Sequence, residues 1–148
     1  QIVPELFGLT RLRKLYLGSN YLEGRLPEEV GSARSLVSLR AQDNYREREN
    51  GSVLSRGITG SLPRSLLNLT RLEDLRLENN FLGGTIPPEF GHKLRNLAWL
   101  RLDLNVLRGR IPSSFGRLVD LKTLSLSGNY MNGPLPKELS NSIRMTTL

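Results

Sequence analysis

The sequence predicts a solenoid built from about five stacked units, and three observations support this fold class. The same apolar skeleton returns about every 24 residues along the chain. Four units contain a Leu-x-Leu pair, and the second has Leu39-x-Ala41 in its place, the alternation expected of a short strand with one buried face. Each unit also places an asparagine shortly after that pair, where the chain must turn. The units align in phase at Leu12, Leu36, Leu72, Leu97 and Leu121.

Each position of a unit has a physical reason, which the third unit illustrates. Leu75 and Leu77 are two residues apart, so they point to the same side of a strand and are expected to be buried. Asn80 follows the strand, and its amide can bond the backbone groups of a turn inside the core. Gly84 allows backbone conformations closed to other residues. Pro87 then fixes its own φ and ends the pattern.

A single unit cannot fold alone, because its few apolar side chains do not outweigh the cost of ordering its backbone. Stacking on neighbouring units must supply the remaining stability. Two units depart from the regular length. The second carries an insertion spread over about residues 45–57, and the third carries an extra residue near His92 and Lys93.

The pattern Leu-x-x-Leu-x-Leu-x-x-Asn-x-Leu-x-Gly-x-Ile-Pro closely resembles the plant-type leucine-rich repeat, and the match covers nearly the whole chain. The resemblance implies an α/β solenoid, a leucine-rich-repeat superhelix of about five repeats of about 24 residues. In that fold a parallel β-sheet forms the concave side. Short strands or helical turns form the convex side.

In function, the resemblance implies non-catalytic recognition of a protein or peptide. Arrays of this family are usually ectodomains of receptor-like kinases or receptor-like proteins, in signalling or defence, so an extracellular or cell-surface location is expected. They also bind other ectodomains, which makes a co-receptor an expected partner. Two alternatives stay open. One is a secreted polygalacturonase-inhibitor-like protein, and the other is an intracellular scaffold with a cytoplasmic location.

Residues 1–148 are expected to form a single array that is truncated at both ends. Ile2 aligns with Leu26, and Met145 opens a sixth unit, so we expect an internal segment of a longer array. The cysteine-paired caps that usually flank extracellular arrays of this family are absent. The insertion, which contains Arg46 to Glu49, has two interpretations: a binding element on a rigid scaffold, or a surface loop without function.

Composition removes most catalytic and metal chemistry from this chain, which has no cysteine and a single histidine, His92. We therefore expect no enzyme activity, no cofactor and no metal, while a kinase domain elsewhere in a longer parent protein would be invisible here. The net charge of +7 is scattered, which favours solubility over a surface for a polyanion such as nucleic acid or acidic polysaccharide. No apolar run approaches the ~18 residues of a membrane span, so membrane attachment would need a segment outside this chain.

Strand geometry sorts the variable residues of each unit onto the concave face, where three arginines stack on successive strands about 4.8 Å apart. In one interpretation Asp74, Glu78 and Asp103 neutralise these arginines and the face is merely solvated. In the other, arginines and aromatic residues form a binding patch for a protein or peptide, including an acidic one, because Arg, Trp and Tyr dominate binding hot spots. The candidate ligand-binding residues are Tyr16, Arg40, Arg76, Glu78, Trp99, Arg101 and Asp103.

Two N-glycosylation sequons are present, Asn50-Gly-Ser and Asn68-Leu-Thr. Asn68 is expected on the outer rim of the solenoid, accessible to a glycan. Together the sequons favour an extracellular location. His92 has no partner histidine or acid pair in the sequence nearby, so it is expected to be an exposed loop residue.

Overall fold

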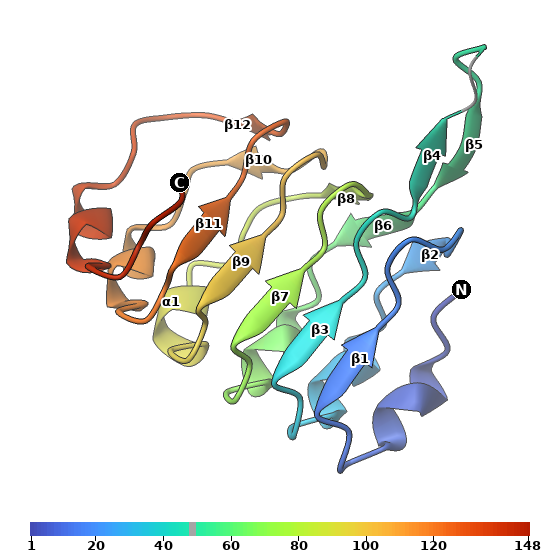
Figure 1. The fold of residues 1–148 in the computed structure, drawn as a ribbon, viewed down its shortest axis with the longest axis horizontal. Coiled ribbons are helices and arrows are strands. Elements are labelled where there is room, and N and C mark those ends of the chain that lie inside the picture. The colour runs from blue at the N-terminus through green and yellow to red at the C-terminus, as the bar shows by residue number, and fades with distance from the viewer. Residues whose placement is uncertain (48–49) are drawn as a thin grey trace.

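The computed structural model describes residues 1–47 and 50–148. Within these residues a five-stranded parallel sheet contains one strand from each unit, in chain order (Figure 1). Since every neighbouring pair is parallel, the chain returns to the same edge after each unit, as a solenoid requires. The strands are β1 (Lys14–Tyr16), β3 (Ser38–Arg40), β7 (Asp74–Arg76), β9 (Trp99–Arg101) and β11 (Thr123–Ser125).

The opposite, convex side of the solenoid is made of short strands and single helical turns. One parallel sheet contains β2 (Gly24–Arg25), β6 (Ile58–Ser61) and β8 (Phe81–Gly83), and a second contains β10 (Arg108–Gly109) and β12 (Tyr130–Met131). Proline directly precedes four of the turns, where its fixed φ fits the entry to a helix. The turns are η1 (Pro4–Gly8), η2 (Glu28–Ser32), η3 (Arg64–Asn68), α1 (Phe90–Lys93), η4 (Ser113–Arg117) and η5 (Lys137–Asn141).

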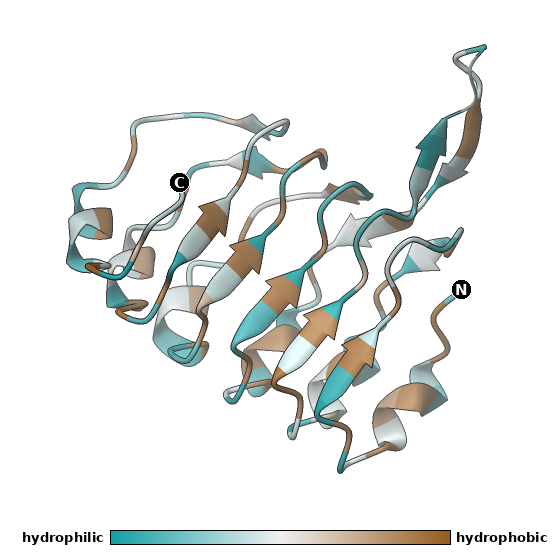
Figure 2. Ribbon diagram, in the orientation of Figure 1, coloured by the Kyte–Doolittle hydropathy of each residue, from teal (hydrophilic) through white to brown (hydrophobic). Residues whose placement is uncertain are grey.

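The hydrophobic core lies between the two sides and is continuous from unit to unit. Figure 2 shows hydrophobic residues recurring in the strands of the main sheet and in the convex turns. The middle residue of each main-sheet strand is a buried leucine, and these leucines face one another in register. Phe90 and Phe115 fill the core from the convex side. The expected inward position of Leu75 and Leu77 is confirmed, because both are fully buried.

A ladder of asparagines bonds successive units at the end of each main-sheet strand. Asn80 is buried, and its Nδ2 donates to the carbonyl oxygens of Ala41 and Leu77 at 2.8 and 3.1 Å. Its Oδ1 accepts from the backbone N–H of Ile58 at 2.9 Å. Asn105 repeats this pattern one unit later. The prediction that this amide satisfies the backbone of the turn is therefore confirmed.

Glycine sets the spacing of the convex turns. In three turns it directly follows the buried apolar residue of the turn. A Cβ added at Gly31, Gly91 or Gly116 would lie 1.9–2.5 Å from a backbone oxygen of the next turn. Only a residue without a side chain lets these turns pack so closely. At the same position η3 carries Leu67, and η3 and α1 are packed less closely than the other successive turns.

The insertion forms an antiparallel hairpin of β4 (Tyr45–Glu47) and β5 (Val53–Arg56). The hairpin projects from the edge of the solenoid where the asparagine ladder lies (Figure 1). Arg48 and Glu49 of the insertion lie outside the described residues. At the other end of the sheet, Thr147 bridges to Thr123 in a parallel manner, where a sixth strand was predicted. In the part of the chain that the structure describes, no helix is long and apolar enough to cross a membrane.

Candidate binding surface on the concave sheet

The main-sheet strands bring all seven predicted site residues onto one face. The first and third residues of each strand point away from the buried middle leucine. Register then places Arg40 beside Arg76, and Arg76 beside Arg101, on neighbouring strands. Tyr16 lies next to Arg40 in the same row. Glu78 and Asp103 lie two residues after the last residues of β7 and β9, in the next column.

Asp74 holds two of the three arginines. Its Oδ2 lies 2.6 Å from Arg40 Nε, and its Oδ1 lies 2.9 Å from Arg76 Nε. The hydroxyl of the buried Ser38 also donates to Oδ2, at 3.0 Å. The Asp74 side chain is 6% exposed, so these charge-assisted hydrogen bonds are shielded from water on the carboxylate side. The hydrogen bond to Asp74 is the main reason that the pKa of Arg40 is raised above its ordinary value.

Arg101 is paired with the other two acids. Its Nη1 lies 3.3 Å from Glu78 Oε1, and its Nη2 lies 3.6 Å from Asp103 Oδ2. Burial raises the pKa of Glu78, and the charge of Asp103 raises it further, against the charge of Arg101 and a backbone hydrogen bond. Glu78 Oε2 and Asp103 Oδ1 are buried without a hydrogen-bond donor among the described residues.

These distances confirm that Asp74, Glu78 and Asp103 pair with the three arginines, while ligand binding by this face stays a prediction. Three guanidinium groups and three carboxylates cancel in formal charge, so this face has no excess positive charge from these six groups. Arg40 and Arg76 use Nε for Asp74. Within the described residues their terminal nitrogens make no hydrogen bond, which leaves forked donors free. The face therefore offers guanidinium donors to a ligand.

The two aromatic side chains of the face are each stacked on a cation. Arg40 lies 4.7 Å from the ring centre of Tyr16, and Lys122 lies 5.0 Å from that of Trp99. Such contacts stabilise ring orientation by about 0.5–1 kcal/mol at exposed sites. Tyr16 is 53% exposed, and Trp99 is half-buried. Both rings are thus held in place while part of each surface stays available.

Sequence reasoning missed Lys122 on this surface and the backbone strain of Leu104, the residue after Asp103. Lys122 precedes β11 and was not assigned to the concave columns, although its contact with Trp99 brings it there. Leu104 is 56% exposed and has a φ of 54°, in the left-handed region that costs a leucine energy. The equivalent position of the last unit is Gly128. A glycine in that alignment was the available signal that Leu104 is in a strained conformation.

The remaining candidates lie away from the sheet. Asn68 ends η3 on the convex side and is exposed, and Asn50 is exposed near the tip of the hairpin. Neither position is tested for glycosylation by the structure. His92 is exposed, but it lies in α1 and not in a loop, because the extra residue of this unit completes an α-helical turn there. Among residues 1–47 and 50–148, no group of three or more acidic or histidine side chains could hold a metal ion.

Known proteins with similar sequences share the repeat. Two family models described as leucine-rich repeat match, over residues 70–131 and over residues 11–33. Receptor-like protein 18 of Arabidopsis thaliana is 34% identical over 136 residues, which is 92% of this chain and 14% of the relative. Receptor-like protein 32 is 32% identical over 88% of this chain. The chain spans about one seventh of the length of these relatives.

Solved structures share the fold. The Arabidopsis receptor kinase HAESA, in complex with the peptide hormone IDA and the co-receptor SERK1, superposes with a TM-score of 0.82 at 31% identity. That match covers 99% of this chain and 23% of the solved one. A chain of the Arabidopsis BIR3–SERK2 complex gives a TM-score of 0.74 at 34% identity, over 93% of this chain and 69% of the solved one.

Proposed function

Because this chain belongs to the plant-type leucine-rich-repeat family, we propose that it is a ligand-recognition segment of a receptor-like kinase or receptor-like protein. In this role it binds a peptide or protein on its concave sheet and catalyses no reaction. An extracellular or cell-surface location follows from that role, as does contact with a co-receptor. The likeness to an ectodomain solved with a peptide hormone and a co-receptor supports the proposal.

The single observation that carries the proposal is the pair of arginines held by Asp74. A guanidinium anchored through Nε keeps its terminal nitrogens aimed outward, and less entropy is lost when they bind a carboxylate. Arg40 and Arg76 are both anchored in this way, on adjacent strands. Tyr16 beside them and Trp99 on the next strand supply rigid contact area.

The ligand is expected to carry at least one acidic group. The acidic group would bind the free ends of Arg40 and Arg76. Glu78 and Asp103 would act through Arg101, which they hold in place from below the surface. Because the six charges of the face cancel, we expect specificity from geometry and only a moderate effect of salt.

The experiment selects peptide ligands for the whole chain from a displayed random library and measures their affinities for variants. Trp99→Ala and Arg76→Ala should each weaken binding at least tenfold, about 1.4 kcal/mol. Arg117→Ala and Lys137→Ala, exposed on the convex turns, should change it little. A dependence on the convex pair and not on the concave pair would show that the binding surface is elsewhere.

A further inference from the structure

A strongly basic surface lies around η3, at the edge of the solenoid where the main-sheet strands begin. A concavity of about 760 Å³ opens there, between the segments that precede β3 and β7 and the end of the convex turn α1 in the next unit. It shares no residue with the concave face described above. Its lining consists of Arg34, Ser35, Arg64, Leu67, Asn68, Thr70, Arg71 and Lys93. We refer to these residues as the η3 groove.

Two irregularities of the repeat accompany this groove. The first is Leu67, which stands where Gly31, Gly91 and Gly116 allow close packing of the turns. A leucine side chain does not fit in the close contact that glycine allows between successive turns. Accordingly, η3 and α1 are packed less closely than the other successive turns. The second is the extra residue of the next unit, which lengthens α1 to Lys93 and places a cation at the rim.

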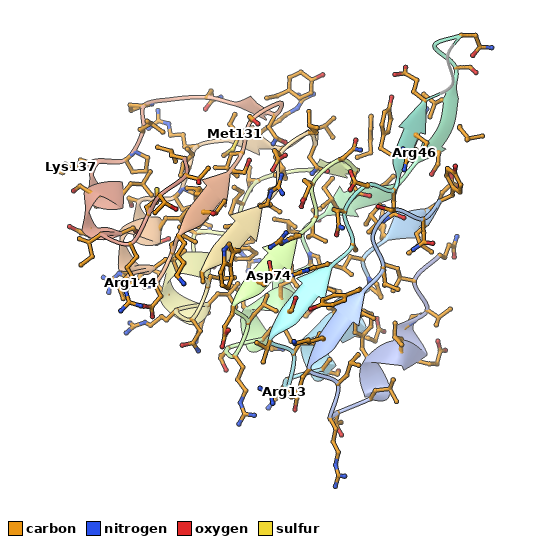
Figure 3. The ribbon with its side chains drawn as sticks, in the orientation of Figure 1. Arg13, Arg46, Asp74, Met131, Lys137 and Arg144 are labelled. Carbon is orange, nitrogen blue, oxygen red and sulfur yellow. The ribbon has the colours of Figure 1, made fainter. Side chains whose placement is uncertain are left out.

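The groove concentrates positive charge without matching acids. Four of its lining residues are cationic, and all four are exposed. Arg64 Nη2 lies 3.7 Å from Glu89 Oε1, a long and exposed pair of little strength. Arg34, Arg71 and Lys93 form no ion pair within the described residues, and none of the described lining residues is acidic. Arg13, labelled in Figure 3, adds a cation at the same edge, where the strands begin.

We propose that the η3 groove binds an acidic oligosaccharide, whose carboxylate or sulfate groups pair with Arg34, Arg71 and Lys93. Forked guanidinium donors on separate elements suit several anionic groups spaced along one chain. A protein partner would need an apolar interface centre, and Leu67 is the single large apolar residue of the described lining. A single-stranded nucleic acid would need aromatic stacking, and the described lining contains no aromatic side chain. A hydrophilic polyanion fits this lining best.

The test measures binding of a linear oligogalacturonate to the 148-residue chain by isothermal titration calorimetry. A sulfated glucan oligomer forms a second arm and a neutral glucan oligomer the blank. Binding is measured both on protein made in bacteria and on protein secreted from a eukaryotic host, because Asn68 lines the groove and is expected to carry a glycan in the secreted form. The same result is expected for both. The groove variant is Arg34→Gln/Arg71→Gln/Lys93→Gln. The matched control is Arg108→Gln/Arg110→Gln/Lys137→Gln, which removes the same charge from other exposed sites.

We expect at least one acidic saccharide to bind, and the groove variant to lose about tenfold in affinity, about 1.4 kcal/mol, while the control variant loses less than about twofold. Circular dichroism first establishes that both variants fold and melt like the parent. The proposal is overturned if neither acidic saccharide binds, or if both variants weaken binding equally, since that is attraction to net charge alone. It is also overturned if oligoglutamate or oligothymidylate binds the groove as tightly, which would assign the site to a protein or a nucleic acid. None of these results bears on the concave face.

Discussion

Replacing Asp74 by alanine tests whether this buried carboxylate holds the concave arginines in place. The change removes the acceptor for Arg40 Nε at 2.6 Å, for Arg76 Nε at 2.9 Å and for the Ser38 hydroxyl at 3.0 Å. Both arginines are about one-third exposed, at 35% and 28%, so water compensates much of their loss. The buried hydroxyl of Ser38 has no such compensation, and an unpaired buried group costs about 1–3 kcal/mol.

Together these contributions give an expected loss of about 2–3 kcal/mol in the free energy of unfolding, measured by urea denaturation. Asp74→Asn keeps the shape and one acceptor oxygen, so a smaller loss of about 1 kcal/mol is expected. Glu73→Ala is the matched control, because Glu73 is the adjacent residue, carries the same charge and is exposed. It should cost less than about 0.5 kcal/mol.

Binding provides the second measurement for the Asp74 variants. Asp74→Asn leaves three guanidinium groups against two carboxylates, so the affinity for an acidic peptide should rise at low salt. It should rise less at high salt, where exposed charges are screened. If Asp74→Ala is no more destabilising than Glu73→Ala, the carboxylate does not order the arginines. The case for preorganised donors on this face would then be refuted.

Three further predictions address the core, the pH dependence and the outer rim. Leu100→Ala should cost about 2–5 kcal/mol of stability and Arg101→Ala less than about 1 kcal/mol, and equal melting of the two would contradict the assigned faces. Burial raises the pKa of Glu78, so the folded state binds the carboxyl proton more tightly than the unfolded state does. The resulting stabilisation is fully present below the ordinary pKa of 4.5 and is lost as the pH rises through the raised pKa. Urea titrations across that range should show this loss in the parent, and a loss of the same size in Glu78→Gln would argue against it. Asn68 should carry a glycan when the chain is secreted from a eukaryotic host, and mass spectrometry showing it bare in folded protein would count against an extracellular location.

Much of the concave surface was predictable from the sequence because strand alternation is a local property. Two residues of separation place Asp74 and Arg76 on one face, whatever the rest of the chain does. The repeat phase places Arg40, Arg76 and Arg101 in one row, and the structure confirms it. Lys122 escaped prediction, because only the path of its long side chain decides that it reaches Trp99.

By itself, the sequence determined the repeat, the strands and the asparagine ladder, since each depends on residue type and spacing within one unit. The tertiary structure alone decided which acid pairs with which arginine, because Asp74 could bind either neighbour and proves to bind both. It also turned the insertion into the projecting β4–β5 hairpin. The η3 groove likewise depends on the fit of Leu67 against the next unit, a distance between side-chain and backbone atoms that no spacing along the chain specifies.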